Sequence, residues 1–575
     1  MAGVCAAIAA ARHGCKTALI QDRPVLGGNS SSEIRMHICG ADSFYDGQAR
    51  RETGILEELR LENLARNPQR SPALWDLLLY EWVKREAELD LYLNTLTLEP
   101  IMESGNHIRA VRARQMASER EWMFEAKYFA DCSGDGQIGA QAGADYRIGR
   151  EAREEFNESL AESKADSYVL GSSILFMARD MGRPMPFARP EWAHHYPSDD
   201  DLSFRPHGVY RYGYWWIEWG GRLDTISDND RIRDELLKIA LGVWDHIKNH
   251  GDHGAENWAL EWVGMLPGKR ESRRFIGDYI LRQGDLESGR IFEDEVAYGG
   301  WPIDVHPIAG FEAREHPCRQ IQVPLYSIPL RSLYSRNINN LFFAGRNISA
   351  THIAFASTRI MATCALTGQA IGTAAAVCRD KGLLPREAAR HAIDVIQRKL
   401  LAEDCFLLGH RNEDAGDMVR LARVTAGSEQ NGREAEKVKD GVARSVGTNE
   451  HCWESASLEA KDNWLQLEWD KPILIGQVQL TFDSELEKQL IFTMDDDLYS
   501  QKTNLLKGLP QRLVRDFEIH ALIDNSWRSV RSVKGNIHRA RRECFLPAMK
   551  TQAIRIICKA THGYAKARIF EIRAY

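Results

Sequence analysis

Residues 3–20 combine a glycine, a helix of small residues and a short apolar strand in an order that strongly constrains the fold. Gly3 precedes a helix predicted over 4–12, whose alanines allow close packing on a sheet, and His13 and Gly14 end it. An apolar strand over 17–20 follows. This order is typical of a βαβ unit that binds a dinucleotide, in which G-x-G-x-x-G joins the first strand to the helix. Gly3 matches the last glycine of that motif, so we expect the first strand and the earlier glycines to be missing ahead of it.

The residues after this strand occupy positions that contact the dinucleotide in a complete unit. Such a strand ends in an acidic residue that hydrogen-bonds a ribose, and Gln21 and Asp22 stand there. Gly27, Gly28 and Asn29 then form a turn suited to a loop that passes close to a bound dinucleotide. An ordinary turn, with alanines that serve only for packing, is the alternative interpretation of this stretch.

Two later segments repeat the pattern of a strand that ends in glycine. A strand over 122–129 runs into the turn 130–136, and a buried strand over 341–346 is followed by a small-residue helix over 359–377. Turns of this kind meet at the carboxyl ends of parallel strands, where they would close one nucleotide crevice. Alternatively, Ser133 or Asp135 only caps a short helix.

Four sequence segments together resemble a known family. They are DRPVLGGNSSSEIRMHICGA, DCSGDGQIGAQAGA, RESRRFIGDY and YSIPLRSLYSRNINNLFFAGRNISATHIAFASTRIMATCALTGQAIGTAAA, and the resemblance covers residues 1 to 400. In this order they are similar to FAD-dependent oxidoreductases of the glutathione-reductase-like fold, in the branch related to the flavoprotein subunit of heterodisulfide reductase. The resemblance implies FAD as the cofactor and hydride transfer to flavin as the chemistry.

The resemblance also implies which residues bind FAD. They are Gly3, Gln21, Asp22, Gly27, Gly28, Asn29, Ser133, Gly134, Asp135, Gly345, Arg346, Ser349 and Thr358. Gln21 departs from the family, because Glu usually stands there and an amide bonds a ribose hydroxyl more weakly than a carboxylate does. The missing first strand would weaken FAD binding. The cysteine motifs that hold iron–sulfur clusters in the heterodisulfide reductase branch do not occur in this sequence.

The region 145–330 is aromatic and irregular, and we expect it to form the substrate domain. Aromatic residues alternate over 210–219 (YRYGYWWIEW), which is typical of a packed sheet face. The same aromatics beside charged residues such as Arg211 and Glu218 would equally suit a sugar-like ligand. Asp304 and His306 lie two residues apart, on one side of an extended chain, and such a pair is more often structural than catalytic.

Hydride transfer from an alcohol requires a group that moves a proton. His352 is the first candidate. It stands at the start of the helix that, by the resemblance, faces the flavin, and an imidazole titrates near neutral pH. A capping or core histidine is an equally good interpretation. His306, Arg35 and His37 are further candidates, the last two in the loop that follows the dinucleotide motif.

Alternating strands dominate the C-terminal quarter of the chain. They are predicted over 464–469, 475–482, 517–523, 527–530, 553–558 and 567–573, and they indicate an all-β sandwich. The segments VKDG, WLQLEWDKPILIGQVQL and ARIFEIRAY, together with Trp453, resemble the discoidin-type galactose-binding jelly roll. Domains of that type often bind glycans at one end, and many serve only as packing partners.

Composition argues against several classes of protein. The formal net charge of −7 and the lack of a long Lys/Arg run argue against a nucleic-acid partner. No run of about 18 apolar residues predicts a membrane span. The 11 cysteines form no C-x-x-C motif, so we expect no iron–sulfur or zinc site. Their scatter fits reduced, buried thiols and favours a cytoplasmic compartment, while an incomplete N-terminus leaves secretion open.

The sequence therefore predicts an α/β, Rossmann-like FAD-binding domain with an inserted α+β substrate domain, followed by an all-β sandwich. The expected boundaries are 1–145 and 331–410 for the FAD-binding domain, 146–330 for the substrate domain, 411–435 for a linker and 436–575 for the sandwich.

The expected function is that of an FAD-dependent oxidoreductase that takes hydride from an alcohol-type carbon of a small molecule, with a sugar or glycoside as the suggested substrate. The alternative is a noncatalytic glycan-binding protein whose flavin domain has decayed. Gln21 and the missing glycines favour that alternative, and the intact later motifs oppose it. A nicotinamide enzyme is a third class, and it would need a second dinucleotide motif. The electron acceptor and the oligomeric state are not predicted by any motif.

Overall fold

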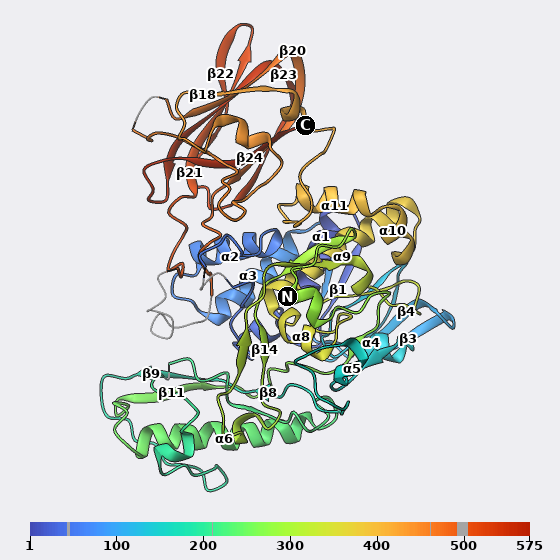
Figure 1. Cartoon of the computed structure of the whole chain (residues 1–575), viewed down its shortest axis with the longest axis vertical. Coiled ribbons are helices and arrows are strands. Elements are labelled where there is room, and N and C mark those ends of the chain that lie inside the picture. Colours follow the sequence, from blue (N-terminus) through green and yellow to red (C-terminus); the bar gives the residue numbers. More distant parts are fainter. Residues whose placement is uncertain (43–45, 210, 460–461, 492–503) are drawn as a thin grey trace. The chain divides into compact units, whose positions relative to one another are not determined.

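The computed structural model describes residues 1–42, 46–209, 211–459, 462–491 and 504–575 (Figure 1). The chain divides into two compact units, and neither is one continuous segment. The first consists mainly of Met1–Ala41 and Arg70–Ile393. The second consists of Asp42–Gln69, Asp394–Leu490 and Asn504–Tyr575, so it takes a piece of chain from within the expected FAD-binding domain.

Short parallel strands and helix α1 lie at the start of the first unit. Helix α1 (Ala2–Arg12) precedes β1 (Thr17–Ile20), which pairs in parallel with β2 (Leu89–Tyr92). Strand β6 (Phe129–Asp131) pairs in parallel with β17 (Leu341–Phe343). The strands predicted over 17–20 and 341–346 are therefore present, whereas the strand predicted over 122–129 is divided between β5 (Glu121–Glu125) and β6. Both pairs are parallel, as a Rossmann-like fold requires.

Helix α9 (Met361–Lys381) packs against α1 with almost no space between the two backbones. A Cβ atom on Gly368 would lie 2.2 Å from the carbonyl oxygen of Ala2, and one on Gly372 would lie 2.2 Å from that of Ala6. Only glycine fits at both positions, because the neighbouring atoms belong to the main chain and cannot rotate away. The small residues of both helices thus fix their separation.

Replacing Gly368 with valine should push the two helices apart. Because the new side chain would collide with the main chain of α1, we expect the free energy of unfolding to fall by about 2–3 kcal/mol. The matched control is Ala375→Val, at a partly exposed position of the same helix. Urea unfolding followed by circular dichroism measures the difference, and equal midpoints for the two variants would contradict the close contact.

The other elements of the first unit are short and mostly antiparallel. Strands β3 (Thr95–Ser104), β4 (His107–Gln115) and β5 (Glu121–Glu125) form a meander. Further strand pairs are β7 (Tyr146–Arg147) with β12 (Arg274–Phe275), β8 (Ser172–Ser173) with β10 (Glu218–Trp219), β9 (Phe176–Asp180) with β11 (Trp258–Val263), β13 (Glu295–Gly299) with β16 (Tyr326–Pro329), and β14 (Ile303–Val305) with β15 (Arg319–Ile321). The helices are α3 (Pro72–Arg85), α4 (Gln137–Gln141), α5 (Arg153–Phe156), α6 (Asn229–Asn249), α7 (Gln283–Glu287), α8 (His352–Thr358) and α10 (Pro385–His391).

Helix α6 and the aromatic residues before it build a separate hydrophobic core. The rings of Tyr214 and Trp216 stack with their centroids 4.6 Å apart, and both side chains are buried against the same cluster as Phe176 and Trp244. The alternating strand predicted over 210–219 is wrong. Within the described residues of this stretch only β10 is extended, because Gly213 turns the chain at a φ of 63°. Residue 210 lies outside the described residues.

The second unit is an antiparallel β-sandwich. Its strands are ordered β19-β24-β20-β23-β21-β22, with β18 also paired to β20. Their bounds are β18 (Arg423–Ala426), β19 (Trp453–Glu454), β20 (Trp464–Phe482), β21 (Val514–Ile523), β22 (Ser526–Val533), β23 (Ala540–Thr561) and β24 (Arg568–Ala574). The strands predicted over 464–469 and 475–482 are one strand, β20, with irregular pairing between them. The expected linker contains β18, so part of it belongs to the sheet.

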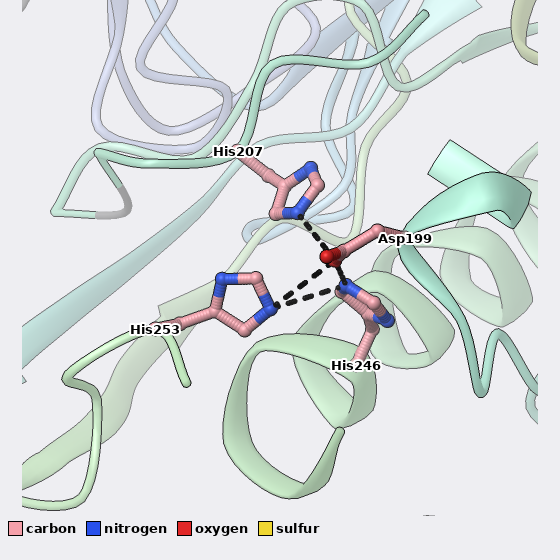
Figure 2. Close-up of side chains that lie close together, drawn as sticks. All are labelled: Asp199, His207, His246 and His253. Atoms are coloured by element: carbon pink, nitrogen blue, oxygen red, sulfur yellow. Dashed lines mark hydrogen bonds and ion pairs between the residues drawn. The ribbon is translucent and has the colours of Figure 1, made fainter. Parts of the chain in front are cut away.

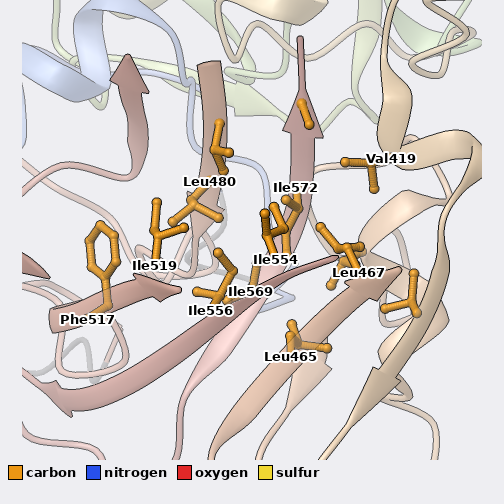
Figure 3. Close-up of a cluster of buried hydrophobic side chains, with 14 of the residues drawn as sticks. Val419, Leu465, Leu467, Leu480, Phe517, Ile519, Ile554, Ile556, Ile569 and Ile572 are labelled. Carbon is orange, nitrogen blue, oxygen red and sulfur yellow. The ribbon is translucent and has the colours of Figure 1, made fainter. Parts of the chain in front are cut away.

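Alternate side chains of these strands fill the interior of the sandwich (Figure 3). Leu465 and Leu467 of β20 and Ile554 and Ile556 of β23 are fully buried, and the side chain between each pair is not. A period of two residues places one face of each strand in the core and the other toward solvent. The alternation seen in the sequence is therefore confirmed as the source of this core.

The segment 42–69 joins the second unit through buried charge, which the sequence analysis did not predict. It contains helix α2 (Ile55–Arg66). Arg51 forms a bidentate pair with Glu57 at 2.6 and 3.1 Å, and its guanidinium also donates to the carbonyl oxygens of Ser484 and Glu485 at 2.7 and 2.8 Å. Burial raises the pKa of Glu57, but Arg51 outweighs that effect and lowers it.

Helix α9 has the length and apolar composition of a membrane span, and 89% of its apolar window is buried inside the protein. That burial is what the central helix of a packed α/β unit requires. All 11 cysteines are free thiols. Burial raises the pKa of Cys132, Cys364 and Cys378 to about 12, so these thiols stay protonated at neutral pH.

Helix α11 (Ile393–Ala402) follows α10 at the boundary between the two units. The two helices are separated at one residue, Ala392. Ala392, which ends α10, lies outside the helical region, with φ −145°.

Candidate active site

Three distant turns converge on the first turn of α1. The amino group of Met1 donates to the carbonyl oxygen of Gly27 at 3.4 Å. A Cβ atom on Gly3 would lie 3.3 Å from Cβ of Cys132, and one on Gly345 would lie 3.5 Å from Cβ of Ala2. The segments that follow β1, β6 and β17 thus surround one helix N-terminus, which is the arrangement that binds a dinucleotide in doubly wound α/β folds.

Glycine is required at two of these turns by their backbone conformation. Gly27 has φ of 102° and Gly345 has φ of 107°, a region that L-residues rarely adopt. A Cβ atom on Gly27 would also lie 2.9 Å from Oγ of Ser30. At Gly28, by contrast, a Cβ atom would meet nothing within 4 Å, so the loop faces open space there.

The first turn of α1 offers main-chain N–H groups to a ligand. Cys5 N–H donates to the carbonyl oxygen of Met1, and among the described residues no side chain caps the turn. Helix N-termini carry partial positive charge and bind phosphate oxygens through such N–H groups. Burial lowers the pKa of the Met1 amino group.

Asp135 links the second turn to the third through a partly buried ion-pair network. Its carboxylate contacts Arg346 and Lys269, at 2.5 and 2.7 Å, and accepts a hydrogen bond from Ser272 at 2.9 Å. Burial raises the pKa of Asp135, but Arg346 and Lys269 outweigh it and hold the pKa well below its usual range. Ser133, in the same turn, is exposed and accepts from Gly136 N–H at 2.9 Å, so its hydroxyl organises the turn.

Replacing Asp135 with asparagine should weaken the first unit in a pH-dependent manner. Because the folded state lowers the pKa of this carboxyl, its contribution is fully present above the ordinary value near 4 and is lost as the pH falls through the lowered value. We expect a loss of about 2 kcal/mol in the free energy of unfolding at pH 7. Urea unfolding of the wild type and the variant at pH 7 and pH 3 measures it, and a difference that grows toward acid would contradict this assignment.

A second G-x-G-x-x-G spacing occurs at Gly134, Gly136 and Gly139, and the sequence analysis overlooked it. Cβ atoms on Gly136 and Gly139 would lie 2.8 and 2.3 Å from the ring of Phe275. These glycines therefore make room for an aromatic side chain of the protein itself. The spacing alone does not support the nicotinamide class.

The loop 29–39 connects the first turn to the start of α9. Asn29 donates to the carbonyl oxygen of Lys269 at 3.0 Å, and Ala362 N–H donates to that of Cys39 at 3.0 Å. His37 lies in this loop and is partly exposed. Burial and the positive charge of Arg270 lower its pKa to about 4. His37 is therefore a neutral imidazole at pH 7, and no side chain of the described residues hydrogen-bonds its ring.

His306 has both ring nitrogens occupied. Nδ1 lies 2.6 Å from Glu218 and Nε2 lies 3.0 Å from Asp304, and all three side chains are buried. Burial lowers the pKa of His306, but the two carboxylates outweigh it and raise the pKa. Arg359, next to Thr358, also contacts Asp304 at 3.1 Å. Both ring nitrogens of His306 therefore face carboxylates, and neither is free to accept a proton from a substrate.

His352 is also held in a buried network. Its Nδ1 lies 2.9 Å from Glu271, and its N–H donates to Glu151 at 2.8 Å. Arg274, with a side chain only 1% exposed, pairs with both carboxylates at 3.2 and 3.0 Å. Burial raises the pKa of Glu271, but His352 and Arg274 outweigh it and lower it. This geometry supports the core-histidine interpretation and positions the start of α8.

Arg35 lies over an aromatic ring and beside a small pocket. Its guanidinium carbon is 4.1 Å from the centroid of Trp262, and its Nη1 contacts the sulfur of Met177 at 2.7 Å. Burial lowers the pKa of Arg35, which nevertheless remains cationic. The pocket is lined by Arg35, Arg70, Pro72, Leu175, Phe176, Met177 and Tyr212.

The remaining predicted residues are Gln21, Asp22, Ser349 and Thr358. Gln21 follows β1 and bonds its neighbour Asp22 at 3.2 Å, and Asp22 is exposed. Ser349 and Thr358 are buried, and their hydroxyls have no hydrogen-bond partner within the described part of the chain. The hydroxyls of Ser31 and Thr363 share this property. Buried hydroxyls without partners are costly, and a polar ligand would satisfy them.

The family described as FAD dependent oxidoreductase matches residues 1–400 of this chain. The chain belongs to that family. This confirms the resemblance stated from the sequence, and FAD is the cofactor on which such oxidoreductases depend. A domain of unknown function, DUF7402, matches residues 417–492.

Solved structures similar to the FAD-dependent oxidoreductase chain are carbohydrate-binding modules. One is the family 32 module of Clostridium perfringens NanJ, solved with galactose. It is 15% identical, the match covers 27% of this chain and 94% of the module, and the TM-score is 0.20. Another is chitosan-binding module 1 of the chitosanase/glucanase from Paenibacillus sp. IK-5. It is 15% identical, the match covers 28% of this chain and 98% of the module, and the TM-score is 0.20. No curated protein matches the chain.

Three features of the site fit a bound FAD. The uncapped first turn of α1 suits a pyrophosphate, the open space beside Gly28 leaves room for a ligand, and buried hydroxyls lack partners. The sequence analysis missed the buried pairs of Glu218, Glu271 and Arg274. Part of the signal was present, because RESRRFIGDY concentrates charged residues, Glu271 and Arg274 among them, in one segment.

Proposed function

We propose that this FAD-dependent oxidoreductase removes hydride from an alcohol-type carbon of a hydroxylated small molecule, and that His37 accepts the hydroxyl proton. The convergence of the Gly27, Cys132 and Gly345 segments on the first turn of α1 is the observation that carries the proposal. FAD, when bound, supplies the hydride acceptor. The protein supplies binding, orientation and the proton acceptor.

His37 is preferred over the other candidates because its lone pair is available. His306 is clamped by two carboxylates and His352 is paired with Glu271. Among the described residues, His37 has no such partner, and it is neutral at pH 7 because its pKa is about 4. A neutral imidazole meets the protonation requirement of a general base, and the loop that carries it hydrogen-bonds to the first turn of α9.

The chain's own groups would hold FAD as follows. The N–H groups of the first turn of α1 suit the pyrophosphate, and Gln21 suits a ribose hydroxyl through its amide. The partnerless hydroxyls of Ser31, Thr358 and Thr363 suit polar ring atoms. Arg346 and Asp135 fix the turns around the cofactor through their ion pair.

We propose a sugar or glycoside as the substrate class. The pocket beside Arg35 places a cationic donor next to Tyr212, an aromatic side chain that is only partly buried, and Arg35 itself lies over the ring of Trp262. Such a combination suits a hydroxylated ring, which stacks on aromatic faces and accepts hydrogen bonds from charged donors. The stacked pair Tyr214 and Trp216 does not contribute, because both side chains are buried in the core of α6.

Reconstitution of the full chain with FAD tests the proposal. We expect the visible absorption bands of bound flavin, and anaerobic addition of sugars or glycosides should bleach these bands while a carbonyl product forms. Flavin binding without bleaching by any alcohol, sugar or glycoside would overturn the proposed chemistry. A chain that binds glycans in a pull-down assay but never retains flavin would favour the alternative of a noncatalytic protein.

A further inference from the structure

A cluster of three histidines and one aspartate lies in the region of α6, on residues that the flavin chemistry does not use (Figure 2). His246 is on the last turn of α6, and His253 follows that helix. His207 and Asp199 come from the preceding loop, about 40 residues earlier in the chain. The side chains point toward one another, and their four ligand atoms all lie within 4.8 Å of one another.

Main-chain carbonyl groups orient two of the imidazoles. Nδ1 of His246 lies 2.7 Å from the carbonyl oxygen of Tyr196, and Nδ1 of His207 lies 2.6 Å from that of Arg205. A carbonyl accepts only, so each Nδ1 carries a proton and each Nε2 faces the cluster. Protein histidines that bind metals are held in the same way, with one nitrogen donating to a carbonyl and the other free for the ion.

The distances between the ligand atoms match those around a tetrahedral ion. Nε2 of His246 lies 3.0 Å from Asp199 and 3.2 Å from Nε2 of His253. Nε2 of His207 and Nε2 of His253 each lie 3.8 Å from Asp199. Two ligands bound to Zn²⁺ at about 2.0–2.1 Å in tetrahedral geometry are separated by about 3.3 Å, which these distances bracket.

Electron-rich atoms that face one another need a cation between them. The lone pair of His246 Nε2 points at a carboxylate oxygen and at a second imidazole nitrogen, and its side chain is only 1% exposed. Repulsion among these groups in a partly buried place is costly without a bound proton or metal ion. Imidazole and carboxylate ligands together suit Zn²⁺ better than Mg²⁺ or Ca²⁺, which prefer oxygen ligands alone.

We propose that Asp199, His207, His246 and His253 bind one Zn²⁺ ion that fastens the loop 199–207 to the end of α6. Four protein ligands fill a tetrahedral shell and leave no position for substrate, so the site is structural. The ion would hold the loop and the helix end together next to the hydrophobic core that contains Trp244 and Trp216. The sequence predicted no zinc site, because that prediction rested on the spacing of cysteines and not on histidines.

Zinc titration of the full chain tests the site. Protein treated with a chelator and then dialysed should bind one equivalent of Zn²⁺ with a dissociation constant below about 1 μM, measured by competition with a chromophoric chelator. Co²⁺ in its place should give the intense visible spectrum of tetrahedral coordination. His207→Gln and His253→Gln should each weaken zinc binding by more than about 100-fold and leave flavin content unchanged. Both residues are partly exposed, so the variants should fold, which circular dichroism checks.

A neighbouring cluster provides the matched control. His195, Asp245 and His250 also lie close together, with 3.2 Å between the two Nε2 atoms of the histidines. His195→Gln should therefore leave the tight zinc equivalent in place. Absence of a tight equivalent in the wild type would overturn the proposal. So would zinc binding that survives in His207→Gln and His253→Gln, or that is lost only in His195→Gln.

Discussion

Replacing His37 with asparagine is expected to lower kcat by about 100-fold to 10,000-fold, which is the range for loss of a general base. The flavin spectrum and FAD affinity should change little, because the imidazole of His37 makes no hydrogen bond to the described residues that would shape the loop. The loop itself is held by main-chain and amide contacts of Asn29 and Cys39. Anaerobic stopped-flow measurement of flavin reduction separates this chemical step from reoxidation.

The pH profile gives this prediction a second readout. The pKa of His37 is about 4, because burial and the charge of Arg270 both disfavour the imidazolium. A base with that pKa is active above it, so flavin reduction should persist from neutral pH down to about pH 5 and fall as the pH approaches 4. An ordinary histidine would instead lose activity near pH 6.5. The acidic limb should be absent from the residual activity of the variant.

The matched control is His391→Asn, on the exposed face of α10. It should retain wild-type kcat and the wild-type pH profile. If His37→Asn reduces flavin as fast as this control, His37 does not accept the proton. A pH limb that remains in the variant would assign the titration to another group.

The parts of the fold that the sequence predicted depend on local pattern. Helix α1, strand β1 and the alternating strands of the sandwich follow from period and composition within a few residues of the chain. The cofactor turns were predicted because glycines mark positions where the backbone adopts positive φ, as Gly27 and Gly345 do. The family resemblance then assigned those turns to one site.

The features that the sequence did not predict depend on distant partners. Glu218 meets His306 across 88 positions, and Thr53 meets Asp404 across 351. No period or spacing marks such pairs, because each partner is an ordinary polar residue in its own segment. The aromatic stretch 210–219 misled for a related reason: Tyr214 and Trp216 are buried by packing against α6, and that burial does not require a strand.

Arg274 exemplifies a distant network with a large expected effect on stability. Replacing Arg274 with methionine should lower the free energy of unfolding by about 3–5 kcal/mol, because Glu151 and Glu271 would remain buried without their shared cation. The guanidinium also donates to the carbonyl oxygen of Ala350 at 3.0 Å, immediately before α8. Loss of that bond should loosen the start of α8 as well. Urea unfolding followed by near-ultraviolet circular dichroism measures the change.

The matched control for this prediction is Arg336→Met. Arg336 pairs with Asp145 at 2.6 Å, but the two side chains are 50% and 38% exposed, so its removal should cost less than about 1 kcal/mol. A further variant, Arg274→Met with Glu271→Gln, removes one of the stranded charges and should recover part of the loss. Equal losses of unfolding free energy in Arg274→Met and Arg336→Met would contradict the prediction. They would mean that Glu151 and Glu271 take up protons or water when the guanidinium is gone, so that the network does not fix the position of His352.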